Sequence, residues 1–325
     1  MIKMKLKVHQ GIILDASREG WDSGATTFGT VFYDEADRRY YFFYTGASPH
    51  WSQASIGIAT SQDGLIFRRR DDVNPIIDLK NLKLKEAVTP VVFQIKNNFF
   101  MVFSGKKLSG GGRRIFIAYS GDLFGPWRFI KQLIKPECPW EGNDIDLGPS
   151  AVKLNENEIL IYYSNVSNKP LFGPGYWFRT LGILKLRINS PKDVEAYRFD
   201  KNPLKHLNGP KGSWNESLFC PGYFKLGSSH YLLPAASTYS IGFPYEQYIG
   251  LIEDSSPYFL KPTKISILID GPKEKEKIIP DVESEIALDT PCPIIKNDEL
   301  WLYYAAMDRS RRIWKTALSI YSLEV

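Results

Sequence analysis

The feature that most constrains the fold is a fivefold repeat of short apolar segments along the 325 residues. Each segment contains a small residue or a proline as an anchor, and successive anchors lie 61, 59, 72 and 70 positions apart. The anchors are Gly29, Pro90, Pro149, Pro221 and Pro291. After each anchor come a polar turn, a second apolar segment such as 40–44, and a third such as 56–59. Polar turns between such runs are typical of hairpins, so each unit is expected to form a small antiparallel sheet.

Five small sheets in one chain need an arrangement that buries both of their apolar faces. The units are too long for leucine-rich or ankyrin repeats and lack helical periodicity, which favours blades stacked around a channel. The sequence therefore predicts an all-β fold, a five-bladed β-propeller, with residues 1–325 forming a single domain. The last unit runs out of chain, so the N-terminal segment 3–8 is expected to join the fifth sheet and close the ring.

Composition narrows the class of protein. The chain is 43% hydrophobic and 24% charged, which suits one globular body with a large core. The formal net charge of +5 is spread among mixed-sign segments, and the run 273–277 is expected to be a solvated loop. Nucleic-acid binding is therefore not expected. No secretory signal and no apolar run of 18 residues occurs, so we expect a cytoplasmic protein that does not bind membranes.

The three cysteines are widely spaced along the chain. Cys138, Cys220 and Cys292 show no metal-type spacing, and we expect them to be buried small residues rather than disulfides or ligands. His9, His206 and His230 form no ligand spacing either, and His50, after the second strand of the first unit, is a candidate for the pocket rim. No metal and no cofactor is therefore expected.

Three units are preceded by a tryptophan with acidic residues close behind it. These are Trp21 with Asp22, Trp140 with Asp144 and Asp146, and Trp214 with Glu216. Indole rings stack on sugar rings, and carboxyl groups move protons at a glycosidic oxygen. The pattern indicates sugar-binding tryptophans beside catalytic acids. The alternative is that these acids are solvated or strand-capping loop residues.

Two turns carry a resemblance to a known family. Segments 58–67 and 117–127 resemble the turns between the third and fourth strands of five-bladed propeller glycosidases, namely the arabinanase/xylosidase family (glycoside hydrolase family 43) and its invertase-like relatives. The likeness covers nearly the whole chain as a repeat plan. It implies a channel in which the first, third and fourth blades each supply one acid.

The resemblance also implies roles for these acids. Asp22 is expected to be the general base, Asp146 or Asp144 the residue that tunes the general acid, and Glu216 the general acid. Inversion is implied as well, and it requires base and acid about 6.5–9.5 Å apart. The sequence departs from the family at the positions where the acids usually stand, which here hold Phe28, Gly148 and Phe219.

Further residues are candidates for binding substrate. Glu86 and Asp289 are expected near the channel end of their blades, where they either bind hydroxyls or are plain loop carboxylates. Segments 168–179 and 237–245 are rich in aromatic residues and form either a substrate wall, with Arg179 binding a hydroxyl or carboxylate, or an apolar plug.

Three functions are compatible with these residues. The first is a glycoside hydrolase acting on a small oligosaccharide or glycoside. The second is a glycoside phosphorylase, and the third is a non-catalytic propeller that binds carbohydrate or a protein partner.

Overall fold

The computed structural model describes residues 3–166, 178–238 and 246–324, and it is built almost entirely from antiparallel strands. The all-β prediction is confirmed. Most of the aromatic segments expected as a substrate wall, residues 167–177 and 239–245, lie outside the described residues. Within the described residues, no helix is long and apolar enough to cross a membrane.

The described strands are arranged in antiparallel sets of four. The first set comprises β2 (Ala25–Asp34), β3 (Arg39–Ala47), β4 (Ala54–Ser61) and β5 (Arg68–Arg69). The second comprises β6 (Leu84–Ile95), β7 (Asn98–Lys107), β8 (Arg114–Ser120) and β9 (Arg128–Ile134). One parallel bridge, Ala54 with Glu86, joins these two sets into an eight-stranded sheet.

The remaining strands form three sheets of four. The third set is β10 (Asp144–Lys153), β11 (Glu158–Val166), β12 (Leu181–Ser190) and β13 (Asp193–Arg198). The fourth is β14 (Ser217–Leu226), β15 (Ser229–Ser237), β16 (Gln247–Asp254) and β17 (Lys264–Asp270). The last sheet has the order β1-β20-β19-β18, with β1 (Lys3–Leu14), β18 (Ile286–Lys296), β19 (Glu299–Asp308) and β20 (Lys315–Glu324).

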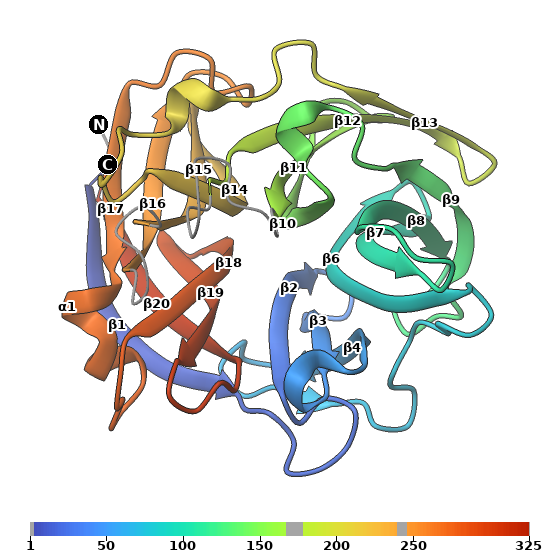
Figure 1. The fold of residues 1–325 in the computed structure, drawn as a ribbon, viewed down its shortest axis with the longest axis horizontal. Helices are drawn as coiled ribbons and strands as arrows, with labels where there is room; N and C mark the ends of the chain where they lie inside the picture. Colours follow the sequence, from blue (N-terminus) through green and yellow to red (C-terminus); the bar gives the residue numbers. More distant parts are fainter. Residues whose placement is uncertain (1–2, 167–177, 239–245, 325) are drawn as a thin grey trace.

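The sets are arranged around a common centre, with β2, β6, β10, β14 and β18 nearest to it (Figure 1). Neighbouring inner strands contact one another all the way around, from β2 through β6, β10, β14 and β18 back to β2. The termini lie close together because β1 pairs with β20 along its length, from Lys3 opposite Glu324 to Leu14 opposite Thr316.

The core consists of layers between neighbouring sheets. One apolar cluster joins the first and second sets, another the second and third, and so on around the centre to the fifth and first. Middle strands such as β3 are therefore buried along nearly their whole length, on both faces. Burial of both faces explains why these strands are continuously aromatic or apolar. A sheet with one face exposed to solvent would instead show alternating apolar and polar residues. Outer strands such as β9 and β17 are much more exposed.

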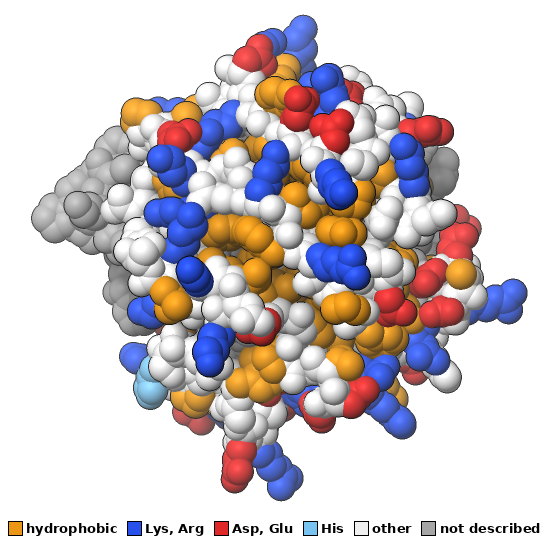
Figure 2. All heavy atoms as spheres, turned by 90° about the vertical axis from the view of Figure 1, so that its right-hand side faces the viewer, with side chains coloured by type: hydrophobic (Ala, Val, Ile, Leu, Met, Phe, Trp, Pro, Cys, Tyr) orange, Lys and Arg blue, Asp and Glu red, His pale blue; other side chains and the backbone are white. Residues whose placement is uncertain are grey.

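Two local features complete the fold. The charged run 273–277, expected as a loop, instead lies in the helix α1 (Gly271–Ile278). Asp270 caps that helix by accepting a hydrogen bond from the Lys273 amide, and Pro272 stands in its first turn. On the side of the molecule at the right of Figure 1, Lys and Arg side chains stand mostly singly between acidic and apolar ones (Figure 2).

Candidate active site

All five inner strands break their pairing register at the same level. The breaks fall between Thr27 and Thr30, Val88 and Val91, Leu147 and Ala151, Phe219 and Gly222, and Asp289 and Cys292. Four residues within these bulges have positive φ, namely Phe28 (51°), Thr89 (50°), Cys220 (41°) and Thr290 (46°). Non-glycine residues in this conformation are strained, and such strain and bulges cluster at functional sites.

The bulges surround a cavity of about 190 Å³ on the central axis. Each of the five sets contributes to its wall, which is formed by Phe28, Trp51, Val88, Thr89, Arg113, Asp146, Cys220, Asp289 and Thr290. Below it the axis is narrowed by Thr30, whose Oγ1 lies 2.9 Å from the Pro90 carbonyl oxygen and 2.7 Å from that of Pro149. This arrangement ties three inner strands together beneath the cavity.

Asp146 enters the cavity as half of an ion pair. Arg113 Nη1 donates to Asp146 Oδ2 at 2.8 Å, and Arg113 Nε donates to Glu86 Oε1 at 2.7 Å. The other carboxylate oxygen, Asp146 Oδ1, is buried and accepts no hydrogen bond from any described residue. A buried acceptor without a donor costs about 1–3 kcal/mol, so this oxygen is suited to bind a group that enters the cavity.

Asp289 is the second carboxylate of the cavity. Burial raises its pKa above the ordinary value, and the negative charge of Asp146 acts in the same direction. Arg179 and hydrogen bonds from Thr290 oppose the shift without cancelling it. The Thr290 amide donates to Asp289 Oδ1 at 2.7 Å, which holds the carboxyl group in place.

Arg179 reinforces the wall behind Cys220. Its Nη2 lies 3.7 Å from Cys220 Sγ and 3.2 Å from Ser164 Oγ, and its guanidinium carbon lies 4.1 Å from the centroid of the Phe219 ring. Burial raises the pKa of the Cys220 thiol, and the negative charge of Asp289 acts in the same direction. Arg179 therefore contributes positive charge next to Asp289 without itself lining the cavity.

Aromatic rings form another part of the wall. The rings of Phe28 and Trp51 have centroids 5.8 Å apart, and Phe28 packs edge-on against Trp314 at 4.7 Å. Trp51 belongs to a short turn of 3₁₀-helix, Pro49–Trp51, that follows β3. The cavity thus combines an apolar ring surface with two carboxyl groups, the combination that a sugar ring requires.

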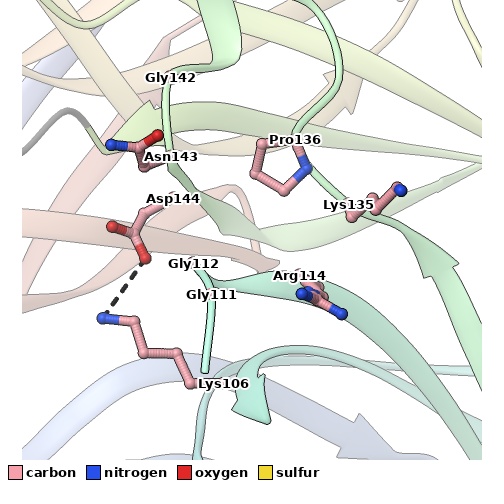
Figure 3. A pocket seen from close by; sticks show the side chains of 9 residues that line it. All are labelled: Lys106, Gly111, Gly112, Arg114, Lys135, Pro136, Gly142, Asn143 and Asp144. Atoms are coloured by element: carbon pink, nitrogen blue, oxygen red, sulfur yellow. Dashed lines mark ion pairs between the residues drawn. The ribbon is translucent and has the colours of Figure 1, made fainter. Parts of the chain in front are cut away.

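A second, open pocket of about 510 Å³ lies beside this cavity, between the β7–β8 connection and the segment leading into β10. Its lining includes Lys106, Arg114, Lys135 and Asp144 (Figure 3). Asp144 Oδ1 accepts a hydrogen bond from the Arg113 amide at 2.7 Å and lies 3.4 Å from Lys106 Nζ. Asp144 therefore stands beside the cavity and faces the open pocket rather than the axis.

Asp22 is not among the residues that line the cavity. Its Oδ2 accepts hydrogen bonds from Tyr44 at 3.1 Å and from Arg69 at 3.0 Å, and Ser17 donates to its Oδ1. Trp21 stacks on Tyr44, and a Cβ atom at Gly46 would come within 2.2 Å of the Trp21 ring. Both residues are packed against their own sheet, the strand-capping arrangement that the sequence left open.

The same arrangement recurs before the third set of strands, with Glu141 in the place of Asp22. Glu141 Oε1 accepts hydrogen bonds from Tyr163 and Arg198, both at 2.7 Å. Trp140 packs over Tyr163, with ring centroids 5.3 Å apart, and a Cβ atom at Gly182 would come within 2.5 Å of the indole. The acid held beside Trp140 is therefore Glu141, whereas Asp146 lines the axial cavity and Asp144 faces the open pocket.

Before the fourth set, Trp214 packs on Gly250 in the same way. Glu216 is buried, and its Oε2 accepts a hydrogen bond from the Gly212 amide at 2.9 Å. Neither residue lines the axial cavity. The structure thus brings Asp146 and Asp289 together, keeps Glu86, Asp144 and Arg179 beside them, and packs the three tryptophans against their own sheets.

Sequence reasoning missed several residues of the site. Arg113, Trp51, Thr89 and Thr290 line the cavity but were not candidates. A usable signal was present, because Thr89, Cys220 and Thr290 each directly precede an anchor proline. Among the described residues, no group of three His, Cys, Asp or Glu side chains is arranged to hold a metal ion.

The fold is shared with carbohydrate-active proteins of known structure. A thermostable family-43 glycoside hydrolase has a TM-score of 0.59 and 14% identity, with 92% of this chain and 93% of that chain covered. The native arabinanase of Bacillus subtilis has a TM-score of 0.57 and 12% identity, over 96% of both chains. The β-1,2-mannobiose phosphorylase of Listeria innocua has a TM-score of 0.60 and 13% identity, over 95% of this chain and 94% of that one.

By sequence, no family model and no curated protein matches this chain. The resemblance to the propeller glycosidases is confirmed at the level of the fold. Identities of 12–14% carry no statement about reaction or substrate.

Proposed function

We propose that this protein cleaves a glycosidic bond in the axial cavity, with Asp289 as the general acid and Asp146 as the general base. The observation that carries the proposal is that two carboxyl groups with different surroundings face one cavity with an aromatic wall. Sites that perform acid and base chemistry together need groups whose environments separate their protonation states.

Asp289 has the properties of a general acid. Burial raises its pKa, so the carboxyl group holds its proton to higher pH than an exposed aspartate does. Such a group can donate its proton to the glycosidic oxygen as the bond to the sugar carbon breaks, and the leaving sugar departs as an alcohol.

Asp146 has the complementary arrangement. Arg113 holds its Oδ2, which fixes the carboxylate and leaves Oδ1 without a donor from the residues that the structure describes. A water molecule bound to Oδ1 can lose a proton to it while the water oxygen attacks the sugar carbon. Asp144, whose Oδ1 already binds the Arg113 amide and Lys106, is better suited to position Arg113 and the strand.

These roles replace those expected for Asp22 and Glu216. The Asp22 carboxylate binds Tyr44, Arg69 and Ser17, and such a fully engaged acid is a poor proton carrier. Glu216 is buried away from the cavity lining. The family positions at Phe28, Gly148 and Phe219 carry no acid, so the catalytic pair of this chain comes from the third and fifth units.

The size of the cavity bears on the substrate. Its volume of about 190 Å³ lies below the roughly 300–1,000 Å³ of sites for drug-sized ligands. One sugar ring stacked on Trp51 fits this size better than a polymer chain does, which favours removal of a terminal sugar from a small glycoside.

The proposal includes the finer description of the fold. We infer a five-bladed propeller, because five apolar layers separate five strand sets and the inner strands contact one another in a closed circuit. The single bridge between Ala54 and Glu86 is then a contact between two blades. The antiparallel pairing of β1 with β20 supports closure of the ring by the N-terminal strand.

Two other functions have support. The likeness to the Listeria phosphorylase favours phosphorolysis as the second candidate, in which phosphate attacks in place of water. The absence of acids at Phe28, Gly148 and Phe219 favours a non-catalytic sugar-binding propeller as the third.

Turnover of aryl glycosides separates the catalytic functions from sugar binding without catalysis. We expect Asp289→Asn to lower kcat at least about a hundredfold, with partial recovery on substrates whose leaving group needs no proton, and Asp146→Asn to lower it by a similar factor. Inversion is checked by the anomer first seen in ¹H NMR spectra of the product. If both variants keep wild-type turnover on a substrate that the protein cleaves, the assignment of the acid and the base is wrong. If the wild type binds sugar but shows no turnover, and both variants keep that affinity, the protein is a non-catalytic sugar-binding protein.

A further inference from the structure

The open pocket beside the cavity concentrates positive charge. Three cationic side chains, Lys106, Arg114 and Lys135, line it together with one acid, Asp144. In Figure 3, Lys106 points toward Asp144 on one side of the pocket, and Arg114 and Lys135 lie on the other.

The cations opposite Asp144 are not neutralised by strong pairs. Arg114 Nη1 has a single long hydrogen bond, 3.4 Å to Gln132 Oε1, and Arg114 forms no ion pair within the described chain. Lys135 Nζ lies 3.6 Å from Glu137 Oε1, but both side chains are about half exposed, at 53% and 54%, where such pairs contribute little. The pocket therefore retains positive charge in a concave setting, which focuses the field on an anion.

The pocket is built by close backbone packing. A Cβ atom at Gly112 would come within 1.4 Å of the Asn143 carbonyl oxygen, so the β7–β8 connection approaches the entry to β10 as only glycine permits. A Cβ atom at Gly111 would come within 2.7 Å of Arg114 Nη2, so the guanidinium lies against this glycine. The Arg114 guanidinium therefore packs against the connection that forms the pocket wall.

Arg113 connects the pocket to the cavity. Its amide binds Asp144 in the pocket, and its guanidinium binds Asp146 in the cavity. Asp144 and Asp146 are two residues apart on β10, so their side chains leave the strand on the same side. A group bound in the pocket therefore lies next to the Asp146 side of the proposed reaction site.

From this geometry we propose that the pocket binds an oxyanion, with Arg114 as the principal cation and Lys106 and Lys135 beside it. The bound oxyanion can come from two sources that share this chemistry. It is either an acidic substituent of the sugar, a carboxylate or a phosphate ester, or free phosphate. The proposal rests on the proposed function for its role in catalysis but not for binding itself. Guanidinium groups bind planar carboxylates and phosphates through paired hydrogen bonds, so an arginine that has no ion pair among the described residues is suited to this role.

The test measures binding directly. Isothermal titration calorimetry at low ionic strength measures the affinity of the full-length protein for three ligands separately. They are sodium glucuronate, inorganic phosphate and uncharged glucose. We expect at least one of the two anions to bind, and Arg114→Gln to weaken it about tenfold or more, the size of a lost charged hydrogen bond. Lys135→Gln should weaken it less. Arg128→Gln, which removes an exposed charge from the neighbouring strand β9, should leave it unchanged.

The outcomes separate the sources and the two proposals. Binding of glucuronate alone points to an acidic sugar, and tighter binding of phosphate points to an acceptor or a phosphorylated sugar. The proposal is overturned if neither anion binds the wild type, or if Arg114→Gln and Arg128→Gln bind equally well. Asp289→Asn should retain anion binding whether or not it affects turnover. The binding experiment can therefore be interpreted even if the catalytic assignment is wrong.

Discussion

Arg113 Nη1 lies 2.8 Å from Asp146 Oδ2, while Asp146 Oδ1 is buried without a donor from the described residues. The pair therefore fixes one oxygen of the carboxylate and leaves the other for a ligand. Glu86, 2.7 Å from Arg113 Nε, holds the guanidinium from its other side. Arg113 thus acts on the proposed base from a neighbouring strand set and connects the second and third units.

Substitution of Arg113 should affect both folding and turnover. Arg113→Gln leaves Glu86 and Asp146 without their shared cation, and breaking a buried pair of this kind costs about 3–5 kcal/mol. Turnover should fall as well, because Asp146 is no longer oriented. Arg113→Lys keeps the positive charge but loses the planar guanidinium that binds two acids at once. Relative to Arg113→Gln, it should therefore restore more of the stability than of the turnover. Urea denaturation and kcat/KM measure the two effects, with Arg128→Gln as the control. Equal recovery of both by lysine would argue against an orienting role.

The raised pKa of Asp289 has a consequence for stability. The folded state binds this proton more tightly than the unfolded state, so the group stabilises the fold at low pH and destabilises it as pH rises above about 4, the ordinary aspartate value. The destabilisation reaches its full size once pH exceeds the raised pKa. Asp289→Asn cannot ionise, and we expect it to be more stable than the wild type at pH 8 and closer to it at pH 4.5. Urea denaturation at both pH values measures this, and a variant that is less stable at pH 8 would contradict the assignment.

Much of the architecture could be predicted from sequence because repetition is visible in it. The anchors Gly29, Pro90 and Pro149 recur with the turns and aromatic strands that follow, and both faces of each sheet must be buried. The prediction of a loop at residues 273–277 was wrong, because the helix α1 depends on the cap at Asp270 rather than on amphipathic spacing. A helix cap of this kind is difficult to recognise in a short polar stretch of sequence.

The site was harder to predict. Asp146 and Asp289 were among the candidates, but the motifs at Trp21 and Trp214 pointed to Asp22 and Glu216, which do not line the cavity. The side chains of the cavity depend on bulges at Thr89, Cys220 and Thr290, and a bulge reverses which residues face the axis. Sequence spacing alone does not register that reversal. Arg113 was missed because its role depends on contacts between separate units.

Glu141 provides a test of the structural role of these acids. Burial opposes its ionisation, but hydrogen bonds from Arg198, from the amides of Cys138 and Glu137 and from Tyr163 outweigh that effect, and its pKa is lowered. It therefore stabilises the fold above its ordinary pKa of about 4.3, and this stability is lost as pH falls through the lowered value. Glu141→Gln should cost about 3 kcal/mol at pH 7, because Arg198 loses its buried partner. The difference should shrink below pH 4.

Asp22→Asn should also destabilise the fold at pH 7, because Asp22 makes contacts with Tyr44 and Arg69 like those of Glu141 with Tyr163 and Arg198. Both this variant and Glu141→Gln should keep wild-type kcat once folded, as measured on samples checked by circular dichroism. A hundredfold loss of kcat in Asp22→Asn with unchanged stability would restore Asp22 as the base and remove Asp146 from that role.

Removal of the N-terminal strand tests closure of the ring. Deletion of residues 1–14 uncovers the edge of β20 and apolar side chains that pack with Leu6, Ile12 and Leu14. We expect Tm to fall by more than about 10 °C and the protein to self-associate, because an unpaired edge recruits other chains. Calorimetry and size-exclusion chromatography measure these effects. Lys7→Gln, which removes only the exposed ion pair with Glu299, should change Tm by little. Unchanged Tm in the deletion variant would show that β1 is dispensable.

Trp51 tests whether the aromatic wall carries the substrate. It lines the cavity beside Phe28, on a turn that lies outside the paired strands. Loss of an aromatic contact is worth about 0.5–1.5 kcal/mol beyond the area it buries, so Trp51→Ala should raise KM about tenfold. Because the ring contacts the sugar before and during the reaction alike, kcat should change much less than KM. Trp51→Phe should recover most of the affinity. A Trp51→Ala variant that loses kcat at constant KM would instead place the indole in the chemistry, and one with unchanged kinetics would move the sugar to another part of the wall.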